Sequence, residues 1–241
     1  MTIDQLLLQM SEFDRSATYY KIIGKNRRKY LYKLRLNTLA DNGETFNEEP
    51  ICGPGGLYFC SIEHIFEFLD YGDKICMLTI PKDARVIKVD NKYKADKIYI
   101  NEIIEINYDT LRHLIKCGAD VASGNNEAIR WASARGHFEL VKWLVELGAS
   151  ATADNNYPIL CASIRGNLEI LKYLVEHGAD ITARNNRAIC CAAKNGHFEI
   201  VKYLTEHGAD ITADNNLAIR WAAQNGHLDI VQYLAKHGAI L

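Results

Sequence analysis

The chain has 241 residues, enough for one large domain or two small ones, and a formal net charge of −2 from 28 basic and 30 acidic side chains. This near-even balance argues against nucleic acid as a partner, because binding to phosphate requires a clear excess of Lys and Arg. The balance holds on both sides of Ile106, with 15 basic and 16 acidic side chains up to it and 13 and 14 beyond it.

The seven cysteines are odd in number and include no C-x-x-C pair, so we interpret them as small buried hydrophobes in a reducing compartment. Their spacing predicts no metal site. The first residues lack the basic start and long apolar core of a signal peptide, and no apolar stretch has the length of a membrane span. We therefore expect a soluble intracellular protein that is not secreted and has no membrane partner, although a virion component would share these features.

Residues 1–106 are predicted to form a small α+β domain. The apolar spacing predicts a helix over residues 2–13, and Ser61 is placed to cap a second helix that reaches Leu69. A Gly-Pro-Gly-Gly turn at 53–56 precedes an apolar run. Strands are predicted over residues 30–36, 57–60, 75–80, 85–89 and 97–100.

Basic side chains cluster within this domain, at Lys25, Arg27, Arg28, Lys29, Lys33 and Arg35. Such a cluster contacts either phosphate, an acidic partner or solvent. We favour a solvated face because the surrounding charge is balanced.

The segment Gly55-Gly56-Leu57-Tyr58-Phe59 is vaguely similar to a segment of ADP-ribosyltransferases. An enzyme that uses a nicotinamide dinucleotide would also need a positioned His or Arg and a catalytic Glu, and the sequence assigns neither. The glycines lack the G-x-G-x-x-G spacing and the P-loop lysine. We therefore predict a protein that is not an enzyme, with no catalytic residue, no cofactor and no metal.

Beyond residue 106 the dipeptide Gly-Ala recurs every thirty residues, at 118, 148, 178, 208 and 238. Aligned on it, a half repeat (107–117) precedes four full repeats, at 118–147, 148–177, 178–207 and 208–237. A repeat of this length cannot bury its apolar face alone and must stack on its neighbours. The half repeat leaves an apolar flank open, so we expect residues 1–106 to dock there and cap the array.

Each repeat follows the same order of features. A short extended piece, such as 180–183, precedes an Asn-Asn pair, which predicts a turn because Asn accepts left-handed backbone. A short first helix follows and ends at a Gly, at 136, 166, 196 or 226. The second helix has an apolar stripe, as at Leu140, Val141, Leu144 and Val145.

The run Asn225-Gly226-His227-Leu228-Asp229-Ile230-Val231, closed by His237-Gly238-Ala239, resembles the ankyrin repeat. The resemblance extends from about Asn107 to the end and implies a mostly α protein, an ankyrin-repeat solenoid of helix-turn-helix repeats. The family's usual repeat has 33 residues, so three are missing from the hairpin loop, and only Pro158 keeps the proline of the Thr-Pro-Leu-His motif. Short repeats with Asn-Asn are similar to ankyrin proteins of giant DNA viruses.

The resemblance implies an adaptor that binds a protein partner through the concave face and the loop tips of the array. Carried over by position, the inner-face candidates are Ala134, Arg135, Ile164, Arg165, Lys194, Asn195, Gln224 and Asn225, and the loop-tip candidates are Glu127, Tyr157, Arg187 and Leu217. These positions vary between repeats while the framework recurs, as in a binding surface; exposed positions that drift freely would vary in the same way.

The partner is expected to be an unidentified protein, such as a host protein met in the cytoplasm, and the chain is expected to be a monomer. Two alternatives stay open: an ADP-ribosyltransferase-like domain that the repeats bring to its substrate, and a virion structural protein.

Two further series recur with the repeat. The aromatic series Trp143, Tyr173, Tyr203 and Tyr233 is interpreted as packing between repeats. The histidines His137, His197 and His227 cannot share one metal ion, because neighbouring helices lie about 8–10 Å apart.

Overall fold

The computed structural model describes residues 13–24, 32, 34–42, 44–47, 49, 52 and 56–241. It divides into two compact units, Met1–Gly124 and Asn125–Leu241, which we call the N-terminal and C-terminal units. All of the predicted helix over 2–13 except Phe13, the Gly-Pro-Gly turn and all of the basic cluster except Arg35 lie outside the described residues.

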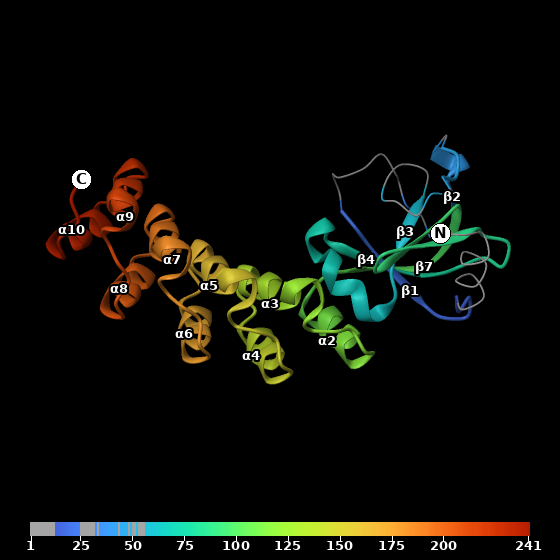
Figure 1. Cartoon of the computed structure of the whole chain (residues 1–241), viewed down its shortest axis with the longest axis horizontal. Helices are drawn as coiled ribbons and strands as arrows, with labels where there is room; N and C mark the ends of the chain where they lie inside the picture. Colours follow the sequence, from blue (N-terminus) through green and yellow to red (C-terminus); the bar gives the residue numbers. More distant parts are fainter. Residues whose placement is uncertain are drawn as a thin grey trace. The chain divides into compact units, whose positions relative to one another are not determined.

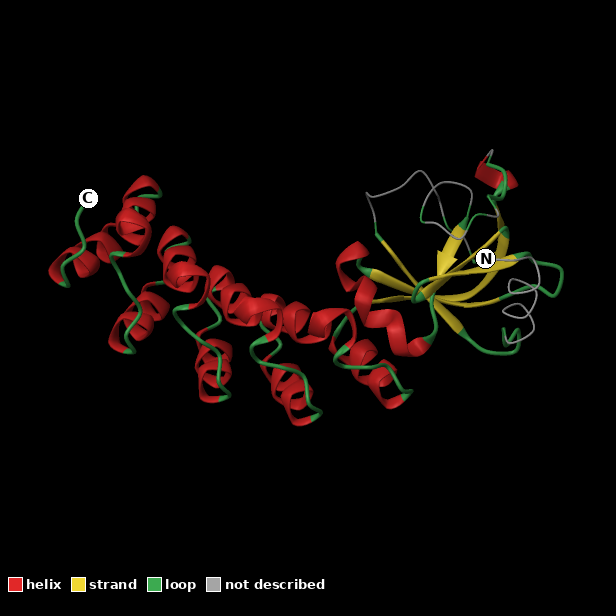
Figure 2. Ribbon diagram, in the orientation of Figure 1, coloured by secondary structure: helices red, strands yellow, loops and turns green. Residues whose placement is uncertain are grey.

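Two antiparallel sheets form the N-terminal unit (Figure 2). The first has the order β1-β4-β7-β2, with β1 Tyr19–Ile23, β4 Lys74–Thr79, β7 Lys97–Glu105 and β2 Arg35–Thr38. The second has the order β3-β6-β5, with β3 Leu57–Phe59, β6 Lys92–Ala95 and β5 Val86–Val89. The strands predicted near residues 57–60, 75–80, 85–89 and 97–100 are confirmed, whereas β1 and β6 were not predicted.

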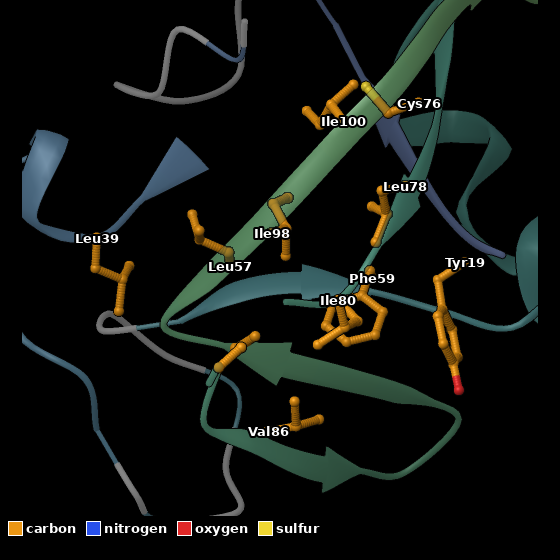
Figure 3. Close-up of a cluster of buried hydrophobic side chains, with 12 residues drawn as sticks. Tyr19, Leu39, Leu57, Phe59, Cys76, Leu78, Ile80, Val86, Ile98 and Ile100 are labelled. Atoms are coloured by element: carbon orange, nitrogen blue, oxygen red, sulfur yellow. The ribbon is translucent and has the colours of Figure 1, made fainter. Parts of the chain in front are cut away.

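The core of this unit is formed by buried residues of both sheets (Figure 3). Alternation along the strands directs Leu57 and Phe59 to one face of β3 and Ile98 and Ile100 to one face of β7, and all four are buried. Aromatic rings extend the core, since the Tyr19 ring lies 5.2 Å from that of Phe59.

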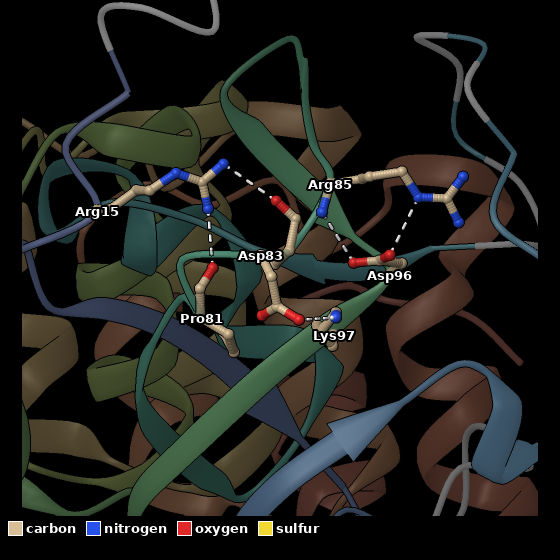
Figure 4. Close-up of polar contacts among 7 residues, drawn as sticks. Arg15, Pro81, Asp83, Arg85, Asp96 and Lys97 are labelled. Atoms are coloured by element: carbon tan, nitrogen blue, oxygen red, sulfur yellow. Dashed lines mark hydrogen bonds and ion pairs between the residues drawn. The ribbon is translucent and has the colours of Figure 1, made fainter.

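Polar contacts fix the loop between β4 and β5 (Figure 4). The Arg15 guanidinium donates hydrogen bonds to the carbonyl oxygens of Pro81 and Ala84, at 2.8 and 3.0 Å. Arg85 Nε donates to Asp96 Oδ2 at 3.0 Å. These cations are occupied by contacts within the fold.

The helix predicted from Ser61 is the 3₁₀ helix η2, Ile62–Tyr71, and Ser61 makes no capping hydrogen bond to its backbone. A second 3₁₀ turn, η1, spans Ala40–Asn42. Helix α2, Tyr108–Lys116, is the predicted half repeat, and Asn107 Oδ1 caps it by accepting from Thr110 N at 2.9 Å.

The half repeat and the start of the first repeat contact η2 within the N-terminal unit. Glu67 Oε1 accepts hydrogen bonds from Ser123 Oγ at 3.0 Å and from Asn91 Nδ2 at 3.1 Å. Gly124 lies so close that a Cβ added there would be 2.7 Å from the Glu67 Cα. Strand β7 ends at Glu105, and α2 belongs to the N-terminal unit, so the predicted domain limit at residue 106 stays a prediction.

Pairs of helices recur through the rest of the chain (Figure 1). The first helices are α3 Ser123–Arg135, α5 Ala153–Arg165, α7 Ala183–Lys194 and α9 Ala213–Gln224; the second helices are α4 Phe138–Glu146, α6 Leu168–Glu176, α8 Phe198–Glu206 and α10 Leu228–Lys236. Helix α5 packs against α7, and α7 packs against α9. The second helices lie farther from one another than the first helices do (Figure 1).

The predicted extended piece before each Asn-Asn pair is wrong. Residues 181–182 form a turn, and the next residues wind in the left-handed direction, with φ of 54°, 59° and 59° at Arg184, Asn185 and Asn186. The Asn186 N–H closes this turn on Thr182 O at 2.8 Å. The shortened loop therefore leaves no room for a hairpin, and Asn is suited to the left-handed backbone.

Side chains at two positions of the repeat bond to neighbouring repeats. Asn186 Oδ1 accepts from Asp210 N at 2.8 Å, and Asn156 accepts from Asp180 N at the same distance. His197 Nε2 lies 3.0 Å from Ile164 O in the preceding first helix, and Asn167 Nδ2 donates to Ser133 O at 3.0 Å. The residue after the helix-ending Gly, at Asn167, His197 and His227, is thus part of the framework.

Candidate functional site

The predicted inner-face residues lie at the C-terminal ends of the first helices. Ala134 and Ile164 are half-buried, and the other six are exposed: Arg135, Arg165, Lys194, Asn195, Gln224 and Asn225. Asn195 and Asn225 donate back to the carbonyls of Cys191 and Trp221, each at 2.8 Å, and so finish their helices.

The loop-tip placement is wrong for Glu127 and Leu217, whose exposed fractions are 5% and 9%. The three residues before Leu217 form the left-handed turn. Leu217 therefore lies in the first right-handed turn of the helix. Tyr157 and Arg187 at the same position are half-buried. The exposed tips belong to the left-handed turn itself, as at Asn155 and Asn185.

A charge-paired cluster joins three repeats around Tyr157. The Asp154 carboxylate pairs with Arg130 at 3.2 Å and with Arg184 at 3.4 Å. Both guanidinium groups also lie over the Tyr157 ring, at 5.5 and 5.3 Å from its centroid. Arg130 makes a further ion pair with Glu127. Within this cluster the positive charges of Arg130 and Arg184 are paired with the carboxylates of Asp154 and Glu127. We therefore interpret the cluster as a contact between repeats.

A second cluster surrounds Trp221 on α9. Arg187 lies 4.6 Å and Lys194 5.0 Å from the centroid of the indole ring, which is half-buried on α9. Arg220, the preceding residue, donates to the backbone oxygen of Asp214 at 3.1 Å. Within the part of the chain that the structure describes, Arg187, Lys194 and Arg220 form no ion pair with a carboxylate.

Charge separates the first helices from the second helices. The first helices carry seven basic and three acidic side chains, and the second helices carry four basic and seven acidic ones. Helix α7 has Arg184, Arg187 and Lys194 and no acidic residue. The near-zero charge of the whole chain conceals this separation, and comparing the helix types in the sequence would have revealed it.

The cysteines beside this cluster are not activated nucleophiles. Burial raises the pKa of the Cys190 thiol to about 11. Burial also raises the pKa of Cys191, against the opposing effect of Arg187 and Lys194. Among the described residues, no group of three or more His, Cys, Asp or Glu is arranged to hold a metal ion.

The segment compared with ADP-ribosyltransferases forms β3, and Leu57 and Phe59 point into the core. Tyr58 is used structurally, because its carbonyl oxygen accepts from Lys21 Nζ at 2.7 Å and its ring lies 5.3 Å from Lys92 Nζ. Gly55 lies outside the described residues.

Two members of the recurring aromatic series, Tyr173 and Tyr233, pack between repeats as predicted. The Tyr173 ring contacts Phe138 of the preceding repeat edge to face at 5.8 Å, and Tyr233 contacts Phe198 in the same way at 5.4 Å. None of the helices that the structure describes has the length and apolar character needed to cross a bilayer.

Helix pairs that repeat every thirty residues, joined by bonds between neighbouring copies, define an ankyrin-type repeat protein. The ankyrin repeat family, described as ankyrin repeats in three copies, matches residues 102–185 and 183–241. The chain belongs to this family.

The chain is also similar to proteins of Acanthamoeba polyphaga mimivirus. It is 33% identical to protein R869 over 132 residues, which are 51% of this chain and 94% of R869. It is 34% identical to R896 over 129 residues and 32% identical to R229 over 107 residues, both named for ankyrin repeats. The matches cover 51% and 40% of this chain but only 39% of R896 and 35% of R229.

Proposed function

We propose that the chain is a non-enzymatic adaptor whose repeats stack as a solenoid and bind a protein partner through the exposed side chains of the first helices. Ankyrin repeats generally mediate protein–protein interaction, and the relatives support a viral setting in which the partner is a host protein.

One observation supports the proposal most strongly. The residues that join repeats recur from repeat to repeat, whereas the exposed side chains of the first helices vary. The positions that join repeats keep the same contacts, as at Asn156 and Asn186. The position two residues before the Gly that ends the first helix changes from Ala134 to Ile164 to Lys194 to Gln224. A fixed scaffold with variable exposed side chains is the arrangement that repeat proteins use for recognition.

The proposal is tested by affinity capture from an Acanthamoeba lysate. The tagged wild type is compared with a quadruple variant, Arg135→Ala, Arg165→Ala, Lys194→Ala and Gln224→Ala. A matched control replaces exposed residues of the second helices, Lys172→Ala, Lys202→Ala, Gln232→Ala and Lys236→Ala. Proteins captured by the wild type and the control, but lost from the quadruple variant, would support the proposal. An unchanged set in all three would show that another face binds.

A further inference from the structure

The cluster around Trp221 identifies the chemistry of the partner, and this inference rests on the proposed function. Arg187 and Lys194 are seven residues apart on α7 and therefore project from the same face of the helix. Both approach one indole ring, at 4.6 and 5.0 Å from its centroid. Two cations thus contact one aromatic ring.

The described residues supply no carboxylate to either cation. Elsewhere in the array Arg130 and Arg184 share Asp154, at 3.2 and 3.4 Å. Asp214 is the corresponding acidic residue of the fourth repeat. Among the described residues it forms no ion pair with Arg187 or Lys194, and its backbone oxygen accepts a hydrogen bond from Arg220. Like charges beside one ring repel each other, and an anion from outside would relieve the repulsion.

We propose that this surface, made of Arg187, Lys194, Arg220 and Trp221, binds an extended acidic segment of the partner protein. A carboxylate of that segment binds between Arg187 and Lys194, and the neighbouring peptide covers the exposed part of the indole. Trp and Arg are the residue types that dominate binding energy at protein interfaces.

The spacing of the helices defines the pattern of the segment. Packed helices lie about 8–10 Å apart, and an extended chain advances about 3.3 Å per residue. Acidic residues three positions apart therefore reach cations near the ends of neighbouring first helices, Arg165 on α5 and Lys194 on α7.

The three tryptophans make a direct test possible, because each indole N–H gives its own NMR signal. The probe is a capped dodecapeptide with Glu at every third position and Ser elsewhere, and the control peptide has Gln in place of Glu. We expect the Glu peptide to shift the Trp221 signal saturably and to leave Trp131 and Trp143 in place. The Gln peptide should have little effect.

The variant Arg187→Gln with Lys194→Gln should weaken the Glu peptide about tenfold, since each exposed charge pair contributes up to about 1 kcal/mol. The variant Lys202→Gln with Lys236→Gln removes the same charge from the second helices and should bind like the wild type. Unmoved Trp131 and Trp143 signals in both variants show that the fold is intact.

Several results would overturn this inference. They are a Trp221 signal that no peptide moves, equal shifts from both peptides, and equal affinity in the Arg187/Lys194 variant. A larger shift with a thymidine dodecanucleotide would assign the surface to nucleic acid. A Trp221 signal that moves with protein concentration alone would assign it to a second copy of the chain. Capture that depends on the first helices without any peptide effect would leave the adaptor proposal standing and reject only the acidic partner.

Discussion

The second Asn of each Asn-Asn pair performs two tasks at once. Its backbone is left-handed, with φ of 62°, 59° and 59° at Asn156, Asn186 and Asn216. Its side chain accepts the backbone N–H that lies 24 residues later, at 2.8, 2.8 and 3.0 Å. The amide of Asn suits both tasks, which explains why the pair recurs where the loop is short.

Replacing Asn186 by Ala should lower the free energy of unfolding by about 2 kcal/mol, because it leaves the Asp210 N–H without its acceptor and places Ala in a left-handed turn. Urea denaturation of the full chain measures the change. The control Asn185→Ala has the same backbone strain, but among the described residues its side chain makes no hydrogen bond to a neighbouring repeat, so its effect should be smaller. Equal losses in the two variants would refute the role of the side-chain bond.

His137 should give the array a dependence on pH. Burial lowers its pKa below the ordinary 6.5, and Arg135 acts in the same direction. Between these two pKa values the unfolded chain binds the proton more readily, so stability is complete above pH 6.5 and is lost as pH falls through the folded pKa.

The variant His137→Asn introduces the residue that the second repeat has at Asn167 and should flatten this decline. Thermal unfolding midpoints of wild type and variant, measured from pH 8 to pH 5, test the prediction. A decline as steep in the variant as in the wild type would show that His137 is not the group responsible.

At the scale of elements, the repeated helices could be predicted because each is specified by its own residues. The Gly at 196 ends α7 with φ of 77°, and the apolar stripe of α8 buries Ile200 and Leu204 as the spacing predicts. The strands β1 and β6 could not be predicted, because charged residues interrupt their apolar pattern. Lys94 of β6 is fully buried and donates to Glu49 O, a partner distant in sequence.

The candidate site, too, could be predicted only in part from the sequence. The resemblance selected Arg187 as a loop-tip residue and Lys194 as an inner-face residue, but their grouping around Trp221 depends on packing between two repeats. Glu127 and Leu217 are buried because a left-handed turn precedes them. The sequence pattern predicts an extended piece there in place of this turn.

The seventh position of the first repeat shows how η2 meets the repeats. It is Gly124, where the later repeats have Asp154, Arg184 and Asp214, and a Cβ there would lie 2.7 Å from the Glu67 backbone. The variant Gly124→Asp should therefore displace η2 and lower the melting temperature by several degrees. The reciprocal change Asp154→Gly keeps η2 in place but loses ion pairs with Arg130 and Arg184. Calorimetry should show a smaller loss for it; the reverse order would contradict this close approach.

At the scale of the whole molecule, we propose that the strand-rich N-terminal part covers the half repeat. Leu111 and Leu114 of α2 are buried, and Glu67 and Glu63 of η2 bond to the residues that follow α2. An uncovered half repeat would expose apolar surface to water.

Deleting residues 1–106 should therefore make the repeats aggregate or melt at a lower temperature. Light scattering and a thermal melt of the 107–241 fragment measure both effects. A monomeric fragment as stable as the full chain would refute the capping role.

The central claim is that a partner contacts the first helices, and site-specific photo-crosslinking tests it most directly. A photoreactive amino acid is placed at Arg165 or Gln224 on the first helices, and at Lys172 or Gln232 on the second helices, all of which are exposed. In an Acanthamoeba lysate the account predicts a discrete crosslinked protein from Arg165 and Gln224 only. Crosslinks confined to Lys172 and Gln232, or equal from both faces, would contradict it.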